Sequence, residues 1–251
     1  MTDVADFATS VARTAGDLLL RIRERGDLTG RALGDRGDAE ANALIQTMIR
    51  ERYPDDAILS EESRDDLARL GRRRLWIIDP LDGTREYREG RDDWAVHIGL
   101  AIDGAAAVGV VALPAKSLVF ASNGDFPLPD RPRPLNIVVS RTRPPAIGAT
   151  IARKLGATII PMGSAGAKAM AVVRGEADIY LHEGGQHEWD NCAPVAVAQA
   201  AGLHCSTLSG AALAYNKPKP TTLDLLICRQ ELAQDILAIT RRARLPDIAH
   251  D

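Results

Sequence analysis

The chain has 251 residues, of which 45% are hydrophobic and 26% charged, so it is long enough and apolar enough to bury a sizeable core. Its formal charge of −3 argues against a nucleic acid polymer as a partner, and its short apolar runs argue against a membrane. Three cysteines without CxxC spacing indicate neither a disulfide framework nor a zinc site. The first residues read as an amphipathic helix rather than a signal peptide, so we expect a cytoplasmic protein.

Two helices followed by strands are predicted in the first half of the chain. Apolar spacing predicts one helix over residues 4–25 and a second from about Asp38 onward. The segment between them, GDLTGRALGDRGD, is rich in Gly and Asp and is predicted to be a loop that could act as a lid. Strands are predicted at Ala57–Ser60 and Leu75–Ile78. The stretch WAVHIGLAIDGAAAVGVVALP then predicts a hairpin, because its Asp-Gly pair supplies the positive φ angles of a tight turn.

A proline-rich segment, DFPLPDRPRP, predicts a boundary between two halves, residues 1–130 and 131–251. Strand and helix signals alternate beyond it. The predicted strands are Leu135–Val139, Thr158–Ile160, Ile179–Leu181 and Leu223–Ile227. The predicted helices are Ala146–Leu155, Ala165–Arg174, Asn191–Ala201 and Glu231–Arg241. We therefore expect an α+β first half and a more α/β second half.

Acidic residues follow the predicted strands. Glu61 and Glu62 follow the first strand, Asp79 and Asp82 follow the second, and Asp190 opens a helix of small residues in the second half. Crowded carboxylates cost free energy unless a cation neutralises them. Oxygen ligands without cysteine and with little histidine favour Mg²⁺.

The hexapeptide DPLDGT gives two of these acids a restricted backbone. Pro80 restricts the chain between the two aspartates, Gly83 lets it turn sharply, and the hydroxyl of Thr84 could orient a water. Structural explanations exist for each motif taken alone. Asp-Pro and Asp-Gly pairs commonly end strands, a Glu-Glu pair is typical of a solvated surface, and Asp190 is typical of a helix N-cap. Their conjunction favours a functional site.

Three signatures resemble the inositol-monophosphatase superfamily of Mg²⁺-dependent, lithium-sensitive phosphatases: SEES at 60–63, WIIDPLDGTREY at 76–87 and EWDNCAPVAVAQAAG at 188–202. Their order and spacing agree with the family, and the likeness covers nearly the whole chain. GDRGD, GRDDWAVHI and GSAGAKAMAV further resemble the CysQ-type 3′(2′),5′-bisphosphate nucleotidases of the actinobacterial kind. The resemblance implies a layered αβαβα sandwich with its active site between the two halves, and a homodimer.

The resemblance also implies roles for individual positions. The matched metal ligands are Glu61, Asp79 and the carbonyl of Leu81 for one ion, and Asp79, Asp82 and Asp190 for a second. Two or three Mg²⁺ ions per active site are expected on this basis. Asp38 and Thr84 match the residues that hold and activate the attacking water. The backbone of Gly83 and Thr84 would receive the phosphate.

The stretch PMGSAGAKAM reads as a strand end, a turn and a helix start, which together form a plausible anion site. Lys168 could add a positive charge there, or could be a solvated helix residue. In bisphosphate nucleotidases the matching segment helps to hold the nucleotide, so Gly163, Ser164 and Lys168 are expected to contact adenosine or its 5′-phosphate. Glu183 matches a glutamate that contacts sugar hydroxyls in inositol monophosphatases and that nucleotidases commonly lack.

The sequence thus predicts an Mg²⁺-dependent phosphomonoesterase acting on a small molecule. The leading substrate is 3′-phosphoadenosine 5′-phosphate, with 3′-phosphoadenylyl sulfate as a second, which would link the enzyme to sulfur assimilation. An inositol monophosphatase or a fructose-1,6-bisphosphatase of the same fold is the alternative. A non-catalytic metal-binding module is disfavoured because Asp38 and Thr84 are both present, and a kinase because no GxxxxGK[ST] loop occurs.

Overall fold

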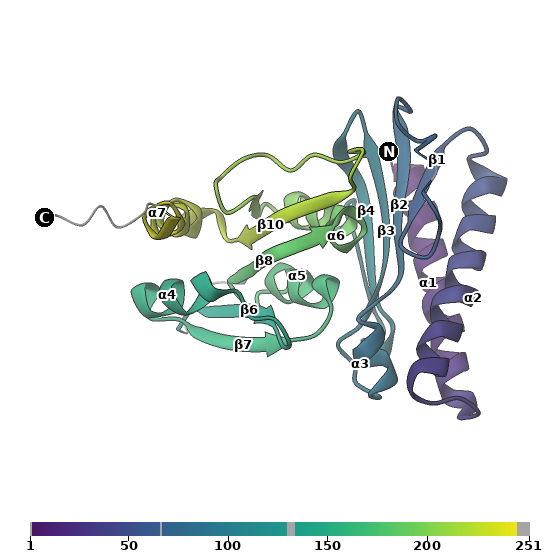
Figure 1. Ribbon diagram of the computed structural model, residues 1–251, viewed down its shortest axis with the longest axis horizontal. Coiled ribbons are helices and arrows are strands. Elements are labelled where there is room, and N and C mark those ends of the chain that lie inside the picture. The colour runs from purple at the N-terminus through teal and green to yellow at the C-terminus, as the bar shows by residue number, and fades with distance from the viewer. Residues whose placement is uncertain (1, 66, 130–133, 245–251) are drawn as a thin grey trace, which may run out of the picture.

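The computed structural model describes residues 2–65, 67–129 and 134–244. Five layers alternate between helices and sheets (Figure 1). The outer helices α1 and α2 cover the first sheet, α5 and α6 lie between the two sheets, and α4 and α7 cover the second sheet. The predicted αβαβα sandwich is therefore confirmed. None of the helices in the described residues is long and apolar enough to cross a membrane.

The elements have the following bounds. The helices are α1 Thr2–Arg25, α2 Gly30–Arg52, α3 Thr84–Arg88, α4 Ala146–Leu155, α5 Ala165–Val173, α6 Glu188–Ala200 and α7 Ala233–Arg244. The first sheet has the order β1-β2-β3-β4-β5, with β1 Ala57–Ser60, β2 Arg74–Asp82, β3 Ala95–Ile102, β4 Ala105–Leu113 and β5 Leu118–Ala121. The second has the order β7-β6-β8-β10-β9, with β6 Asn136–Ser140, β7 Thr158–Met162, β8 Ile179–His187, β9 His204–Ser206 and β10 Thr221–Cys228.

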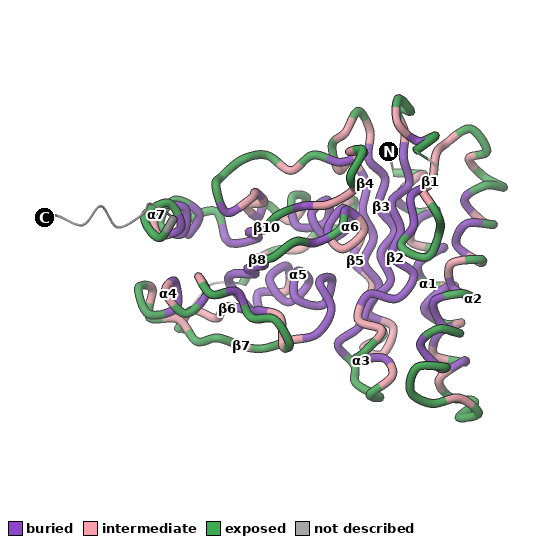
Figure 2. Tube along the Cα trace, viewed as in Figure 1, coloured by how far each residue is buried: buried purple, intermediate pink, exposed green. Residues whose placement is uncertain are grey.

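The central helix α6 is buried between both sheets because small residues let it approach the first sheet closely (Figure 2). A Cβ atom on Gly109 of β4 would lie 2.3 Å from the carbonyl oxygen of Ala193, and one on Gly99 of β3 would lie 3.0 Å from the sulfur of Cys192. Neither position has room for a larger residue. This contact fixes the start of α6, and with it Asp190, against the strands of the first sheet.

The predicted loop before Asp38 is wrong, because α2 already begins at Gly30. Its glycines are packing positions rather than helix breakers. A Cβ on Gly34 would lie 2.8 Å from the side chains of Thr84 and Arg88, and one on Gly37 would lie 3.0 Å from Leu19. Asp38 consequently lies inside a helix, one turn beyond Gly34, where it faces α3. Residues 30–37 of the predicted lid are therefore helical.

The strand before Asp79 is longer than predicted, because β2 continues to Asp82. Asp79 pairs with His97 and Asp82 pairs with Ala95, so β2 uses one more residue than β3 between these two pairs. This is a β-bulge, which bends a strand and redirects its side chains. The two aspartates therefore lie on an irregular strand end and not in the turn that follows it.

Most of the remaining elements agree with their predictions. The hairpin turns at Asp103 and Gly104, whose φ angles are +51° and +78°. The short strands β5 and β9 and the helix α3 were not predicted, since segments of three to five residues carry little periodicity. Residues 125–129 of the proline-rich segment form no helix or strand, and residues 130–133 lie outside the described residues. The division of the chain at residue 130 stays a prediction.

Candidate active site

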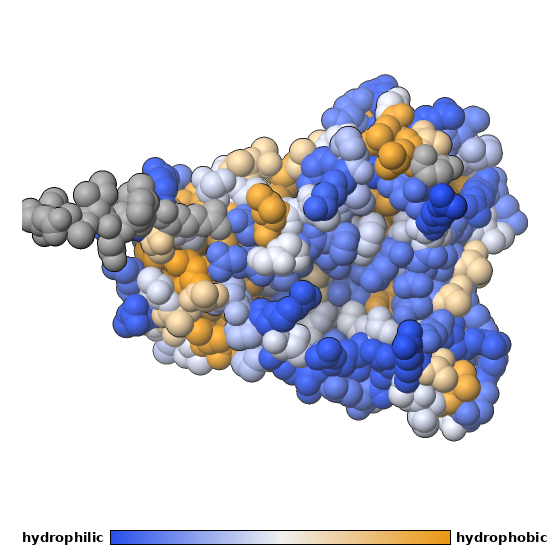
Figure 3. Space-filling model, viewed as in Figure 1, coloured by the Kyte–Doolittle hydropathy of each residue, from blue (hydrophilic) through white to orange (hydrophobic). Residues whose placement is uncertain are grey.

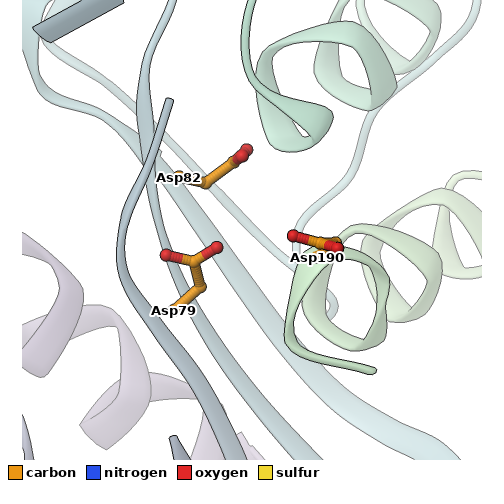
Figure 4. A group of neighbouring side chains, drawn as sticks. All are labelled: Asp79, Asp82 and Asp190. Atoms are coloured by element: carbon orange, nitrogen blue, oxygen red, sulfur yellow. The ribbon is translucent and has the colours of Figure 1, made fainter. Parts of the chain in front are cut away.

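Three aspartates from two distant segments meet at one place. Asp79 and Asp82 extend from the bulged end of β2, and Asp190 extends from the first turn of α6. One carboxylate oxygen of each lies within 4.8 Å of the others, and the three side chains face a common space (Figure 4). A cluster of this size, made only of oxygen donors, suits a hard divalent cation.

Hydrogen bonds fix the direction of each carboxylate. Asp79 Oδ1 accepts from the backbone nitrogen of Leu81 at 3.1 Å, and Asp190 Oδ2 accepts from that of His187 at 2.7 Å. The Asp190 bond is half of a capping box at the start of α6, so this aspartate caps a helix and also belongs to the cluster. Asp82 Oδ2 accepts from the hydroxyl of Ser164 and from the backbone nitrogen of Gly166.

The acids repel one another strongly. Burial, followed by the charges of Glu61 and Asp82, raises the pKa of Asp79 well above its ordinary value. Burial and the charge of Asp190 raise the pKa of Glu61 to about 7, while a hydrogen bond with Asp79 opposes this shift. Burial and the charge of Asp82 raise the pKa of Asp190 to about 6. A bound cation would relieve this repulsion, so the donor set fits the divalent metal that the sequence predicts.

Asp82 differs from its neighbours because cations surround it. Burial raises its pKa, but the charge of His97, a hydrogen bond with it and the charge of Lys168 outweigh burial and bring the pKa to about 2. His97 is fully buried; its Nε2 lies 3.2 Å from Asp82 Oδ2 and its Nδ1 lies 3.0 Å from the carbonyl of Trp189. His97 lies within the stretch GRDDWAVHI, but nothing in that stretch indicates a role for it; in the structure it pairs with Asp79 across β2 and β3.

Asp38 and Thr84 lie beside the cluster. Asp38 is 8% exposed, and its Oδ1 has no hydrogen-bond partner among the described residues. Burial and the charges of Glu62 and Glu61 raise its pKa to about 8, and a hydrogen bond with Thr84 opposes this shift. The Thr84 hydroxyl also lies 3.1 Å from the Leu81 carbonyl. A buried carboxylate oxygen without a partner is costly, so this oxygen marks a place where a polar ligand can bind.

The buried lysine of α5 organises the turn before that helix. Lys168 is 4% exposed, donates to the carbonyl oxygens of Gly163 and Ser164, and lies 5.3 Å from the ring centre of Tyr180. Burial lowers its pKa to about 8, against the raising effect of Asp82. The alternative that Lys168 is a solvated helix residue is therefore wrong.

A cavity of about 690 Å³ adjoins the aspartates, which is large enough for a nucleotide-sized ligand. Of the predicted substrate residues, Gly83, Thr84, Gly163, Ser164 and Lys168 line this cavity. Glu183 does not line it; this residue lies on β8 opposite Asp224 of β10. The lining also contains four arginines that sequence reasoning missed, Arg85, Arg88, Arg141 and Arg143. Arg85 lies within WIIDPLDGTREY, but the resemblance assigns it no role, and Arg88, Arg141 and Arg143 lie in none of the matched stretches.

Similarities to known proteins extend over almost the whole chain. Residues 1–244 match the inositol monophosphatase family. The chain is 47% identical over 256 residues to a 3′-phosphoadenosine 5′-phosphate phosphatase from Mycobacterium leprae, a match that covers 96% of this chain and 94% of the relative.

Two solved structures share the fold. One is CysQ from Bacteroides thetaiotaomicron, described as a bacterial member of the inositol monophosphatase family, with a TM-score of 0.80 and 25% identity over 91% of this chain and 97% of that one. The other is inositol monophosphatase II from Staphylococcus aureus, with a TM-score of 0.81 and 22% identity over 94% and 95%. Because the two scores are nearly equal, the fold alone does not distinguish their substrates.

Proposed function

The chain belongs to the inositol monophosphatase family, and we propose that it hydrolyses the 3′-phosphate of 3′-phosphoadenosine 5′-phosphate to give AMP and phosphate. The observation that carries this proposal is the convergence of Asp79, Asp82 and Asp190 beside a cavity of nucleotide size. The relative at 47% identity, named for this phosphatase activity, supports the choice of substrate. A role in sulfur assimilation follows from that substrate.

We propose Mg²⁺ as the cofactor, with two or three ions per active site. The residues that would hold it are the three clustered aspartates, Glu61 and the Leu81 carbonyl. When bound, Mg²⁺ would lower the pKa of an attacking water and neutralise charge on the phosphate. The raised pKa values of Asp79, Glu61 and Asp190 support this assignment, because each reports a carboxylate that lacks a neutralising partner.

The chain's own residues would position the reactants. The free Oδ1 of Asp38 and the nearby Thr84 hydroxyl would orient the attacking water, and Asp38 would accept its proton as the new bond to phosphorus forms. The backbone N–H groups of Gly83 and Thr84 would receive the phosphate oxygens. Gly83 has a φ of +88°, and a Cβ there would lie 3.2 Å from Ser164, so a larger residue would be strained and crowded at this position. The bond from phosphorus to the 3′-oxygen would break in line with the attack.

The same cluster would serve an inositol monophosphatase or a fructose-1,6-bisphosphatase. This alternative is tested by comparing the rates at which the enzyme hydrolyses the different substrates. Glu183, the residue that favoured it, does not line the cavity. Phosphate release in Mg²⁺ should be measured for 3′-phosphoadenosine 5′-phosphate, 3′-phosphoadenylyl sulfate, inositol 1-phosphate and fructose 1,6-bisphosphate. We expect kcat/KM to be at least about tenfold higher for the two nucleotides, a difference of about 1.4 kcal/mol. Faster hydrolysis of inositol 1-phosphate would overturn the proposal.

We further propose that the enzyme is a cytoplasmic homodimer, as the resemblance to the family suggests. Light scattering of the purified protein tests the dimer, and fractionation of cells tests the compartment. A monomer at working concentration would contradict the homodimer. Recovery of the protein outside the cytoplasm would contradict the cytoplasmic compartment.

A further inference from the structure

The cavity is acidic where it meets the aspartates and cationic elsewhere. Its acidic lining comes from the end of β1, from β2, from α6 and, through Glu86, from α3, whereas its arginines come from α3 and from the segment that follows β6. Figure 3 shows hydrophilic residues gathered on this face, over α3 and toward the neighbouring ends of β6 and β7. A monophosphate bound at the acidic end needs no such cationic region, so its presence requires a separate explanation.

Three of the five cations in the lining are already engaged by the protein. Lys168 donates to two backbone carbonyls below the cavity. Arg141 forms ion pairs with Glu86 at 2.7 Å and with Glu89 at 2.8 Å, and thereby ties the segment after β6 to α3. Arg88 donates from Nε to the carbonyl of Thr84 at 3.3 Å. Lys168 and Arg141 are thus committed to the wall of the cavity. Arg88 keeps further N–H donors, but it is half-buried, and its side-chain carbons pack against Gly34 of α2.

Arg143 and Arg85 are different. Both side chains line the cavity and are exposed, and neither forms an ion pair with any residue that the structure describes. The backbone of Arg143 is fixed, because its nitrogen donates to the Ser140 hydroxyl at 3.2 Å. Its charge also reaches His182 on β8, where it adds to burial and to Lys168 in lowering the pKa of the imidazole. Arg143 thus carries an unpaired guanidinium over the part of the cavity formed by β8.

We propose, on the premise of the proposed function, that Arg143 and Arg85 form a second anion subsite, which binds the 5′-phosphate that the enzyme does not cleave. Guanidinium groups are suited to this task because they bind phosphate oxygens through paired, charge-assisted hydrogen bonds. The carboxylates of the acidic end repel any phosphate that is not neutralised by a metal ion. The 5′-phosphate is therefore directed to the cationic end. The 3′-phosphate is thereby directed to the aspartates.

This arrangement makes the enzyme selective for substrates with two anionic groups. An inositol monophosphate places hydroxyl groups, not a phosphate, near Arg143. It leaves both guanidinium groups without a charged partner. The subsite therefore acts on substrate choice and leaves the bond-breaking step unchanged.

The test compares 3′-phosphoadenosine 5′-phosphate with 3′-AMP, which lacks only the 5′-phosphate. In the Arg143→Gln variant, kcat/KM for the bisphosphate should fall at least about tenfold, the lower end for a hydrogen bond to a charged group, while that for 3′-AMP stays within about twofold. Arg85→Gln is expected to show the same selective loss to a smaller degree. The matched control is Arg153→Gln, because Arg153 is an exposed arginine of α4 outside the cavity lining. This substitution should leave kcat/KM unchanged for both substrates. Equal losses on both substrates, or no loss in either cavity variant, would overturn the subsite.

A binding measurement separates this inference from the proposed function. The dissociation constants of 5′-AMP and of adenosine should be measured by calorimetry in Mg²⁺ for the wild type and for Arg143→Gln. The substitution should weaken 5′-AMP binding about tenfold and leave adenosine unchanged. If the wild type failed to hydrolyse the bisphosphate, the proposed function would be wrong, but a selective loss of 5′-AMP affinity in Arg143→Gln would still establish the subsite. An unchanged affinity for 5′-AMP would refute the subsite even in an active nucleotidase.

Discussion

The two ends of the cavity are built in opposite ways. At the acidic end the carboxylates are held by backbone hydrogen bonds, and the elements that carry them are locked by the close contact of α6 with β3 and β4. At the cationic end Arg143 and Arg85 are exposed and unpaired among the described residues. The acidic end is rigid, and repulsion between its carboxylates costs free energy. The cationic end is solvated, so its charges cost little free energy.

Because of this difference, the acidic end would carry out the reaction and the cationic end would select the substrate. A metal and a water must be positioned within tenths of an ångström, which needs rigidly held carboxylates. Such an arrangement is retained only if binding of the metal offsets the repulsion between the carboxylates. Recognising an additional phosphate needs only a charge at the correct distance. A family can therefore keep one reaction centre and change substrates by altering a few exposed residues at the other end. Each end can therefore be perturbed separately.

The largest effect should come from the acidic end. Replacing Asp82 by Asn keeps the shape of the side chain but removes the charge that faces the other aspartates. We expect kcat/KM to fall by more than about 100-fold, because substitution of residues that merely support metal ligands already costs about 10–100-fold. The measurement is phosphate release at saturating Mg²⁺, with circular dichroism to verify the fold.

Asp17→Asn is the control for this substitution, since Asp17 is an exposed aspartate of α1. It should leave kcat/KM unchanged. An Asp82→Asn variant that retained more than a tenth of the wild-type rate would place the metal ligands elsewhere.

The contrast between the ends also explains what the sequence could predict. Asp79, Asp82 and Thr84 lie in one hexapeptide, so the local pattern predicted that they lie close together, but their expected roles depended on the family resemblance. Asp190 required the family resemblance, because its position depends on how α6 packs between two sheets. Arg143 could not be predicted, since nothing near it in the sequence shows that its segment is tied to α3 by Arg141.

Two differences between the sequence-based predictions and the structure have a common physical cause. Gly34 and Gly37 were interpreted as loop residues, but in the folded protein they let α2 pack closely against α3 and α1. His97 was not singled out, although it connects Asp82 to the backbone before Asp190. In both cases tertiary contacts override the local preference of the sequence, and these contacts are non-local.

A second, intermediate effect should appear in the stability of the protein without metal. Burial and neighbouring charges raise the pKa values of Asp38, Glu61 and Asp190 to about 8, 7 and 6, from ordinary values of 3.8, 4.5 and 3.8. Between about pH 4 and pH 8 the folded state therefore binds more protons than the unfolded state. The free energy of unfolding is highest below this window and falls as the pH rises through it. Tm of the chelator-treated protein should fall by several degrees between pH 5.5 and 8.

Mg²⁺ should reverse this loss, so the Tm gain on adding it should be larger at pH 8 than at pH 5.5. Asp38→Asn should have a shallower fall, because its uncharged side chain no longer titrates. The comparison should stop at pH 8, since burial lowers the pKa of Lys168 from 10.5 to about 8 and contributes the opposite slope above that pH. A metal-free Tm that stayed level or rose with pH would mean that the acids do not repel one another as the structure implies.

The smallest effect should come from the cationic end and should respond to salt. Exposed charges are screened at moderate ionic strength, where the Debye length falls below about 10 Å, while buried charges are screened much less. Raising NaCl from about 0.05 to 0.5 M at saturating Mg²⁺ should increase KM for 3′-phosphoadenosine 5′-phosphate roughly three- to tenfold and change kcat less than twofold. KM for 3′-AMP should rise less, because that substrate lacks the phosphate that meets Arg143. In Arg143→Gln the salt dependence of KM for the bisphosphate should approach that for 3′-AMP, with Arg85 leaving a small difference, whereas a steep dependence retained in this variant would assign the attraction to other cations of the cavity.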